Sequence, residues 1–504
     1  MPSCRAYGRL RSLPAAALIL GLCLSLISGY AQAEAKRANI VLIVTDDEDV
    51  AAHAFMPKTK ALIEDQGTAF ENFFVSLSWC CPSRASILRG QYAHNTHIVG
   101  NEPPWGGFET FRQLGLEEST VATWLHDAGY RTAMVGKYLN RYVPERDGVP
   151  PGWDEWYVGG NAHRSYDYVL NENGQSVQYG SAPEDYLGDV LTQKAVQVIR
   201  SSAGAGQPFF LYVLPFNPHS PSVAAPRHEG MFADAELPRP PSFDEPDVSD
   251  KPAFIHRLPP LDQDQIAYLE YEYRRRIASL QAIDDMVESI VAALSETGQL
   301  DTTYVIYTSD NGFHMGEHRL IAGKDTPYEE DIRVPMVMRG PGVPVGERVD
   351  ALVVNIDLAP TFADIAGIEA PDFVDGRSFL PLLQEPERPW REAFLIERRV
   401  LEEQLVRQSK FTGLTPEELD QAAVLNGIRM RDLVYIEYGS GERELYDLTQ
   451  DPHQLANLAD ETDPVLVSAL SARLVELAEC TSARCRELED LPLMAGEPSL
   501  VAAQ

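Results

Sequence analysis

Four short stretches of the chain are continuously apolar and rich in β-branched and aromatic residues, and each gives way to polar residues. Runs without alternation are typical of strands that are buried on both faces of a parallel sheet. The stretches cover residues 39–45, 130–135, 209–214 and 302–308, and the polar residues that follow are Asp46-Asp47, Gly136-Lys137, Asn217-Pro218-His219 and Ser309-Asp310-Asn311-Gly312.

Helical patterns separate these predicted strands. Ser119-Thr120 can cap a helix that ends at Gly129, and apolar residues from Ile283 to Leu294 recur at helical spacing before Gly298. This alternation predicts an α/β fold, with helices on both faces of a mostly parallel sheet. Ligands bind such sheets at the carboxyl ends of the strands, so we expect the four polar clusters to meet at one site.

Two of these clusters carry the oxygen ligands of a hard cation. Asp46 and Asp47 follow one predicted strand, and Asp310 and Asn311 follow another. Carboxylate and amide oxygens suit Ca²⁺ or Mg²⁺, whereas zinc prefers His and Cys. A single Asp at a strand end is usually a turn or cap residue, so the pattern alone leaves that alternative open. The pair Asp284-Asp285, inside a predicted helix, is expected to lie on a solvated face.

The charge of the chain limits its partners. The 504 residues contain 42 Lys and Arg against 75 Asp and Glu, a formal net charge of −33, and 44% are hydrophobic. The hydrophobic share is that of an ordinary globular protein and excludes a wholly disordered chain. Nucleic acid and anionic membrane surfaces attract clustered Lys and Arg, so the net negative charge argues against either as the main partner.

The N-terminal residues 1–33 read as a secretory signal peptide. Three arginines precede an apolar run over residues 15–27, and Ala31-Gln32-Ala33 offers small residues at a cleavage site. The run is shorter than the ~20 apolar residues of a spanning helix, although an uncleaved anchor is the alternative. We therefore expect an exported protein, periplasmic, extracellular or lumenal, without stable membrane insertion, that is cleaved near Ala33 and then carries a net charge of −36.

The segment Cys80-Cys81-Pro82-Ser83-Arg84 precedes residues that can continue as a helix to Gly90. Adjacent cysteines rarely bridge each other, so the structural alternatives are two buried thiols, a metal site or disulfides to other cysteines. A thiolate at a helix N-terminus beside Arg84 would also be a candidate nucleophile.

This segment resembles the signature of the type I sulfatases, C-x-P-S-R followed by a helix. Cys80 is in the register of the cysteine that this family oxidises to formylglycine, and Cys81 is at the variable position. Further motifs occur in family order over residues 38–460: Gly136-Lys137-Tyr138-Leu139-Asn140, Asn217-Pro218-His219, Thr308-Ser309-Asp310-Asn311-Gly312, Arg333-Val334-Pro335 and Glu444-Leu445-Tyr446-Asp447. With Tyr92-Ala93-His94-Asn95, the chain is most similar to N-acetylglucosamine-6-sulfatases and extracellular heparan sulfate 6-O-sulfatases.

The resemblance implies an alkaline-phosphatase-like fold and one Ca²⁺. That ion would be bound by the formylglycine made from Cys80 and by Asp46, Asp47, Asp310 and Asn311. A maturation enzyme would have to convert Cys80, and a geminal diol there could attack sulfur and then expel sulfate.

The resemblance also implies roles for the cationic residues. Arg84 would hold the formylglycine hydroxyl, Lys137 and Lys324 would grip the sulfate oxygens, and His219 would lie near the leaving oxygen. His314 or His318 could help to protonate the leaving group, with His318 the choice for the site. Many family members have a His two positions after the motif lysine, where this chain has Leu139.

The implied function is hydrolysis of a sulfate monoester, with a 6-O-sulfated glucosamine-type sugar as the expected substrate. The alternatives are an arylsulfatase of broad specificity and a phosphodiesterase or phosphonate monoester hydrolase of the same superfamily. A non-catalytic glycan-binding relative is disfavoured, since a pure binder needs no oxidisable nucleophile.

The alternation of predicted strands and helices weakens from about residue 385, which divides the mature chain in two. Residues 34–385 form the expected catalytic domain, in which the Pro-rich stretch 221–260 is a long irregular excursion, either a lid over the substrate or an inert loop. Residues 386–504 form the expected C-terminal subdomain, with a hairpin around Gly439-Ser440-Gly441, a helix over about 464–478 and a tail. Cys480 and Cys485 are expected to form a disulfide, with metal binding as the alternative.

Overall fold

The four apolar stretches become neighbouring strands of one sheet in the computed structural model, which describes residues 1–3, 8, 37–160, 162–399, 415 and 424–492. The expected signal peptide and most of the tail lie outside the described residues. Among the described residues, no helix is both long and apolar enough to span a membrane. The described residues from Ala38 onward belong to one compact unit.

The described part of the main sheet has ten strands in the order β11-β2-β10-β9-β1-β8-β4-β5-β6-β7. The five strands from β9 to β5 run parallel, and β10, β6 and β7 are antiparallel to their neighbours toward the centre. The strands are β1 (Asn39–Thr45), β2 (Thr68–Phe70), β4 (Arg131–Lys137), β5 (Glu155–Gly159), β6 (Val169–Glu172), β7 (Gln175–Gln178), β8 (Phe209–Leu214), β9 (Thr303–Ser309), β10 (Met336–Arg339) and β11 (Glu347–Val349).

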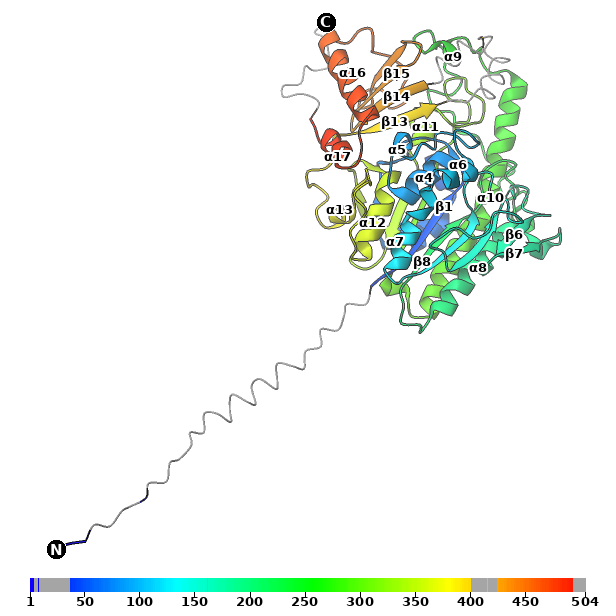
Figure 1. Cartoon of the computed structure of the whole chain (residues 1–504). Helices are drawn as coiled ribbons and strands as arrows, with labels where there is room; N and C mark the ends of the chain where they lie inside the picture. Colours follow the sequence, from blue (N-terminus) through cyan, green and yellow to red (C-terminus); the bar gives the residue numbers. More distant parts are fainter. Residues whose placement is uncertain (4–7, 9–36, 161, 400–414, 416–423, 493–504) are drawn as a thin grey trace. The chain divides into compact units, whose positions relative to one another are not determined.

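Alternate residues of the central strand β1 enter two different hydrophobic clusters, because successive side chains of a strand point to opposite faces. Ile40, Leu42 and Val44 pack with one set of helices, α4 (Cys80–Arg89), α7 (Val121–Asp127) and α12 (Leu358–Ile365). Val41 and Ile43 pack with the other set, α3 (Pro57–Leu62), α8 (Leu187–Ser202) and α10 (Gln263–Glu296). The expected layering of helices on both faces is confirmed (Figure 1).

The prediction that Asp284 and Asp285 lie on a solvated helix face is wrong for Asp284. Asp284 is buried in α10, where its carboxylate accepts hydrogen bonds from the backbone N–H groups of Lys58 and Thr59 at the start of α3. It therefore caps a neighbouring helix, while Asp285 is partly exposed and pairs with Lys58. The pair does not form the solvated face that its position in the sequence suggested.

The C-terminal part contains a four-stranded antiparallel sheet, β13 (Ala393–Arg399), β14 (Val424–Met430), β15 (Leu433–Tyr438) and β16 (Arg443–Asp447). The expected hairpin is formed by β15 and β16, and its turn contains Gly441. The expected helix is α16 (Pro464–Ala478), and α17 (Ala483–Glu489) follows it.

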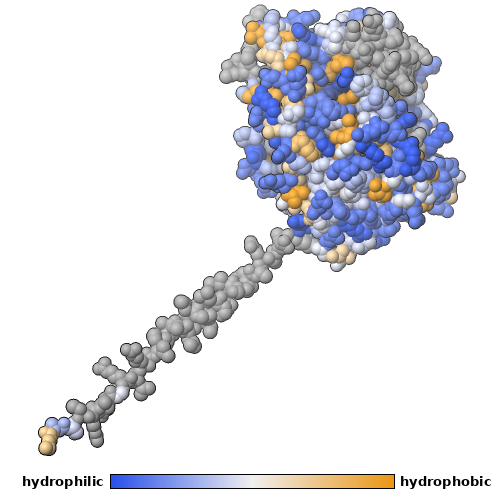
Figure 2. Space-filling model, in the orientation of Figure 1, coloured by the Kyte–Doolittle hydropathy of each residue, from blue (hydrophilic) through white to orange (hydrophobic). Residues whose placement is uncertain are grey.

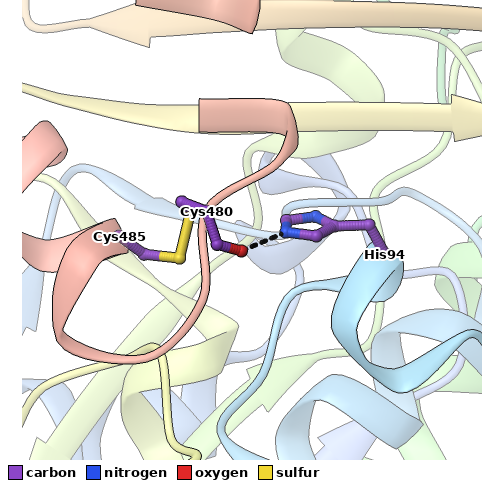
Figure 3. A group of neighbouring side chains, drawn as sticks. All are labelled: His94, Cys480 and Cys485. Atoms are coloured by element: carbon purple, nitrogen blue, oxygen red, sulfur yellow. Dashed lines mark hydrogen bonds between the residues drawn. A yellow bond between two sulfur atoms is a disulfide. The ribbon is translucent and has the colours of Figure 1, made fainter. Parts of the chain in front are cut away.

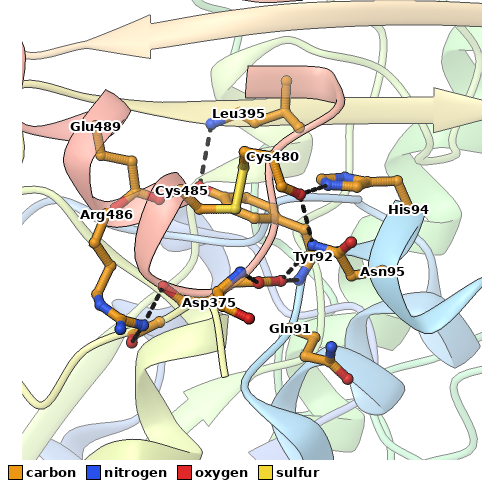
Figure 4. The surroundings of a disulfide bond; sticks show 12 residues. Gln91, Tyr92, His94, Asn95, Asp375, Leu395, Cys480, Cys485, Arg486 and Glu489 are labelled. Carbon is orange, nitrogen blue, oxygen red and sulfur yellow. Dashed lines mark hydrogen bonds between the residues drawn. A yellow bond between two sulfur atoms is a disulfide. The ribbon is translucent and has the colours of Figure 1, made fainter. Parts of the chain in front are cut away.

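The predicted disulfide between Cys480 and Cys485 is confirmed, with an S–S distance of 2.05 Å. His94 of α5 (Ala93–Thr96) points at this loop, and Nε2 of His94 lies 2.8 Å from the carbonyl oxygen of Cys480 (Figure 3). Asn95 and Asp375 contact the same loop (Figure 4). These contacts join the disulfide loop to Asp375 and to the segment that follows α4.

The Pro-rich stretch is mostly irregular, with short helices only at η4 (Pro226–His228) and α9 (Ala253–His256). Lys251 donates to the carbonyl of Leu455, and the backbone N–H of Ala253 donates to Glu442. The stretch is thus fastened to the C-terminal sheet region, and its role as a lid stays a prediction. Hydrophilic side chains predominate on the face shown in Figure 2, with hydrophobic ones scattered among them.

Smaller elements complete the described fold. They are α2 (Val50–His53), η1 (Glu64–Gln66), β3 (Phe73–Phe74), α6 (Gly107–Gln113), η2 (Leu116–Glu118), η3 (Pro183–Asp185), η5 (Leu300–Thr302), α11 (Glu329–Ile332), β12 (Val353–Val354), η6 (Asn355–Asp357) and α13 (Leu380–Gln384).

Candidate active site

Parallel strands bring the predicted site residues to one edge of the sheet. Asp46 and Asp47 follow β1, Asp310 follows its neighbour β9, and Lys137 is the last residue of β4. His219 follows β8, which lies between β1 and β4. The expected meeting of the polar clusters at the carboxyl ends is therefore observed.

Cys80 is the first residue of α4 and is 1% exposed. Its Sγ lies 3.6 Å from Oδ1 of Asp46, 4.0 Å from Oδ1 of Asp47 and 2.7 Å from Nζ of Lys324. Burial raises the pKa of Cys80 to about 12, although Lys137 and Lys324 act in the opposite direction. At neutral pH the thiol keeps its proton, so as a cysteine the residue is a poor nucleophile.

Arg84 lies one turn further along α4 and is buried. It forms ion pairs with Asp46, which follows β1, and with Asp310, which follows β9. Its Nε and Nη2 lie 2.8 Å and 2.7 Å from Oδ2 of Asp310, and Nη2 lies 3.1 Å from Oδ1 of Asp46. Nη1 donates to the carbonyl oxygen of Tyr138 at 2.9 Å. Burial would lower the pKa of Arg84, but Asp310 and Asp46 raise it above its ordinary value, so the guanidinium stays charged.

Two lysines each form an ion pair with one of the adjacent carboxylates Asp46 and Asp47. Nζ of Lys137 lies 2.6 Å from Oδ2 of Asp46. Nζ of Lys324 forms an ion pair with Asp47 and lies 3.5 Å from Oδ1 of Asn311. Burial would lower the pKa of Lys324, but Asp47 raises it, so this ammonium also keeps its charge. The site therefore holds three buried carboxylates and three cationic side chains.

The oxygen atoms of the site fit a hard divalent cation. Asp46, Asp47, Asp310 and Asn311 supply carboxylate and amide oxygens, the donor set that Ca²⁺ prefers. One ligand atom each from Asp46, Asp47, Cys80 and His219 lie within 4.8 Å of one another. Burial alone would raise the pKa of Asp46, but Lys137 and Arg84 lower it well below its ordinary value, so its carboxylate is available as a ligand.

Two histidines lie side by side next to these carboxylates. Nε2 of His219 lies 3.7 Å from Oδ2 of Asp47, and its Nδ1 lies 2.7 Å from the carbonyl oxygen of Ser220. The ring centroid of His163 is 4.4 Å from that of His219. Burial and Lys137 lower the pKa of His163 to about 3, so its imidazole is neutral. The sequence analysis missed His163, although it follows the end of β5 as the other site residues follow their strands.

His318 is the one predicted site residue whose described contacts lie elsewhere. Its Nδ1 is 2.6 Å from Glu245, and its ring centroid lies 4.2 Å from that of Tyr328, with an angle of 31° between the ring planes. His314 pairs with Asp331, and its backbone forms a two-bond bridge with Gly323, next to Lys324. Among the interactions of the described residues, none joins His314 or His318 to Cys80 or to the carboxylates around it, so His318 as a proton donor stays a prediction.

Leu139, where the sequence lacks the histidine of many relatives, is 2% exposed and packs in the core cluster below the sheet edge. It offers no polar atom to the site. At this position of the motif the site therefore has no imidazole.

The fold and the site define a hydrolase that acts on an anionic ester. The chain belongs to the sulfatase family, whose model, described as Sulfatase, matches residues 38–368. It is thereby a sulfuric ester hydrolase, which confirms the predicted enzyme class.

Sequence matches to named sulfatases cover most of the chain. Human N-acetylglucosamine-6-sulfatase is 36% identical over 495 residues, which cover 93% of this chain and 89% of that protein. An extracellular sulfatase Sulf-1 homolog of Caenorhabditis elegans is 39% identical over 71% of this chain. The match covers 52% of that second relative, so this chain spans about half of its length.

Solved structures confirm the predicted fold class. One similar protein was solved in complex with its substrate, D-glucosamine-2-N,6-O-disulfate. Its structure has a TM-score of 0.71 and 24% sequence identity to this chain, over 88% of this chain and 97% of that protein's chain. A phosphonate monoester hydrolase from Silicibacter pomeroyi has a TM-score of 0.67 at 25% identity, over 86% of this chain and 93% of that one.

Proposed function

We propose that the protein hydrolyses the 6-O-sulfate ester of a glucosamine-type sugar. The proposal is supported by the likeness to N-acetylglucosamine-6-sulfatase along 93% of the chain. It is also supported by the fold shared with a protein whose substrate is a 6-O-sulfated glucosamine. The fold alone does not identify the sugar, because sulfatases of one fold act on many esters.

The observation that carries the proposal is the position of Cys80. Its Sγ points at two carboxylates and an ammonium, at the start of a helix whose next turn supplies Arg84. We propose that Cys80 is converted to formylglycine by a maturation enzyme of the host. As its hydrate, formylglycine supplies a nucleophilic hydroxyl and a second hydroxyl whose deprotonation lets the sulfated enzyme release its product.

The positive charges of Lys137, Lys324 and Arg84 offset the negative charge of the sulfate ester. The sulfate ester carries one negative charge, and Lys137 and Lys324 offer two ammonium groups beside residue 80 to its oxygens. Arg84 is fixed by Asp46 and Asp310 before substrate arrives, so its charge costs no reorganisation during the reaction.

His219 is the proton donor that we assign to the leaving oxygen. Its Nδ1–H donates to the carbonyl of Ser220, which fixes the ring, and Nε2 then faces Asp47 and the reaction centre. A protonated Nε2 can hand its proton to the sugar alkoxide as the S–O bond breaks, which is worth ~10²–10⁴-fold in rate.

One Ca²⁺ is the metal that we propose for the site. Asp46, Asp47, Asp310 and Asn311 would bind it together with residue 80, and the ion would supply Lewis-acid stabilisation of sulfate and nucleophile oxygens. The carboxylates of Asp46, Asp47 and Asp310 would then contact both the ion and the three cationic side chains. Export through a signal peptide over residues 1–33 is part of the proposal and is supported by relatives that are named extracellular.

A panel of sulfated saccharides tests the substrate. Purified protein with formylglycine at position 80 is assayed for sulfate release from glucosamine bearing 6-O-, 3-O-, 2-O- or N-sulfate, and from an aryl sulfate and an aryl phosphonate monoester. Preferred hydrolysis of the 6-O-sulfate supports the proposal, and preferred hydrolysis of the phosphonate or of another sulfate position contradicts it. Cys80→Ser should abolish turnover, whereas Cys81→Ser, at the adjacent position, should keep it.

A further inference from the structure

Lys324 lies in the loop between β9 and α11, and the residues after it are fastened to the segment that leads into α4. The carbonyl oxygen of Thr326 accepts a hydrogen bond of 3.0 Å from the hydroxyl of Ser78, two positions before Cys80. The backbone N–H and the hydroxyl of Thr326 both donate to Oδ2 of Asp331, at 2.9 Å and 2.6 Å. One end of the stretch that carries Lys324 is therefore fixed.

Asp325, the residue next to Lys324, pairs with the C-terminal sheet. Its Oδ2 lies 3.2 Å from Nε of Arg398, which belongs to β13. The side chains of Asp325 and Arg398 are 7% and 6% exposed. A buried charge is costly unless it is paired, so each of the two groups stabilises the position of the other.

The backbone at Asp325 makes a sharp turn, with a φ of +75°. That left-handed conformation is unfavourable for a residue with a side chain, although Asp tolerates it better than most, and it persists where the surroundings hold it. The ion pair with Arg398 is one contact that holds it. On the other side of the turn, Nζ of Lys324 lies 2.7 Å from Sγ of Cys80. The two neighbouring side chains thus reach different partners, one in the C-terminal sheet and one in the site.

Arg398 comes from a strand end that is itself anchored. The backbone N–H of Glu397 donates to the carbonyl oxygen of Ser76, and the Glu397 carboxylate accepts from the backbone N–H groups of Ala93 and His94. These partners lie shortly before and shortly after α4. The end of β13 is therefore held in a fixed position relative to α4, and Arg398 is held with it.

We propose that Arg398 is a positioning residue of the active site, whose ion pair with Asp325 fixes the turn that directs the Lys324 ammonium to residue 80 and to the sulfate oxygens of the substrate. The inference rests on the proposed sulfatase function and gives the C-terminal sheet a part in the site. Arg398 acts through Asp325, since its ion pair is with that carboxylate, whereas Lys324 is the residue that contacts Cys80. A displaced ammonium loses much of its effect, because preorganised groups act only in the correct geometry.

Steady-state kinetics of the converted enzyme test this role, with 4-nitrophenyl sulfate and glucosamine 6-sulfate as substrates. Burial raises the pKa of Asp325 to about 7, although Arg398 acts in the opposite direction, so the assays are run at about pH 8, where the carboxylate is ionised. Arg398→Ala should lower kcat/KM by roughly 10- to 100-fold. Arg398→Lys keeps the charge and should recover most of that loss. Asp325→Asn keeps a residue that tolerates the left-handed turn but removes the charge, and it should lose as much as Arg398→Ala.

A double-mutant cycle with Lys324 separates positioning from general stability. In a Lys324→Ala background, Arg398→Ala should cost less than about a further twofold in kcat/KM, because the group that it positions is absent. Arg443→Ala removes an exposed arginine of the same sheet that pairs with Glu437, and as the matched control it should keep the kcat/KM of the parent. If Arg398→Ala does not fold, the cycle is run with Asp325→Asn.

An unchanged kcat/KM in Arg398→Ala, an equal loss in Arg398→Lys, or a full independent loss in the Lys324→Ala background would each overturn the positioning role. Joint dependence on Arg398 and Lys324 in an enzyme that prefers another sulfate ester would support this inference and contradict only the proposed sugar. A converted parent without activity on any sulfate ester would overturn the proposed function and this inference together.

Discussion

Nζ of Lys324 lies 2.7 Å from Sγ of Cys80, although 244 positions separate the two residues in the sequence. The lysine belongs to the loop after β9, and the backbone of His314 pairs with Gly323 to hold that loop in place. The loop thereby carries a buried ammonium across the end of β1 to the first residue of α4. A lysine in this position contacts both Cys80, the proposed nucleophile position, and Asp47, a proposed metal ligand.

Lys324→Ala should remove one fixed positive charge from the sulfate site. Because such preorganised donors are worth about 10²–10³-fold in kcat, we expect a loss of that size in steady-state kinetics. Circular dichroism should show an unchanged fold. Lys60→Ala, which removes an exposed lysine paired with Asp65, should leave kcat within a factor of two of the parent. A Lys324→Ala enzyme with full activity would show that this ammonium does not act on the sulfate.

Asp47→Asn should abolish tight Ca²⁺ binding, since it removes a charged ligand from a cluster of four oxygen-bearing residues. Elemental analysis of dialysed protein measures the metal directly and does not depend on activity. The matched change Asp285→Asn alters a partly exposed carboxylate on α10 and should leave the calcium content unchanged. Equal calcium in Asp47→Asn and the parent would rule out this residue as a ligand.

His219→Gln distinguishes proton donation from simple binding. A sugar alkoxide is a poor leaving group and needs a proton, whereas a nitrophenolate leaves without one. We expect kcat to fall by ~10²–10⁴-fold on the sugar sulfate and by much less on 4-nitrophenyl sulfate. Equal losses on the two substrates would assign His219 a binding role and no acid catalysis.

We expect His94 to make the stability of the C-terminal sheet region depend on pH. Burial would lower the pKa of His94, but the charge and hydrogen bond of Glu397 raise it to about 9, from an ordinary value of 6.5. A raised pKa in the folded state means that its stabilisation is complete below about pH 6.5 and is lost as the pH rises through about 9.

The matching experiment compares urea unfolding of the parent and of His94→Gln, which cannot be protonated. The stability lost in the variant should be on the order of 2 kcal/mol at about pH 6 and much smaller at about pH 10. His126→Gln, on the exposed side of α7, should show no such pH-dependent difference. A loss in His94→Gln that is the same at both pH values would contradict the role of the charge.

The sequence predicted the strands that carry the chemistry because each is a continuous apolar run with polar residues directly after it. Asp46, Lys137 and Asp310 needed only the rule that parallel strands end at one edge. The same rule would have found His163, but Glu155–Gly159 is short and its apolar run is less marked. The disulfide was predictable because its cysteines lie five positions apart in an expected exported protein.

Long-range packing explains what the sequence could not reveal. Nothing local shows that Asp284 caps α3, since the backbone N–H groups it accepts from lie more than 200 positions away. His318 stands near the metal motif in sequence, yet it turns to Glu245 in the Pro-rich stretch. Lys324 was assigned by resemblance, and its contacts with Cys80 and Asp47 in the structure give a physical reason for that assignment.

The most direct test of the account is the mass of the peptide that contains residue 80, measured in a preparation whose sulfate release from glucosamine 6-sulfate has been quantified. The account predicts formylglycine at position 80, in an amount proportional to the activity of each preparation, with Cys81 unmodified. An active preparation in which Cys80 is entirely unmodified cysteine would contradict it.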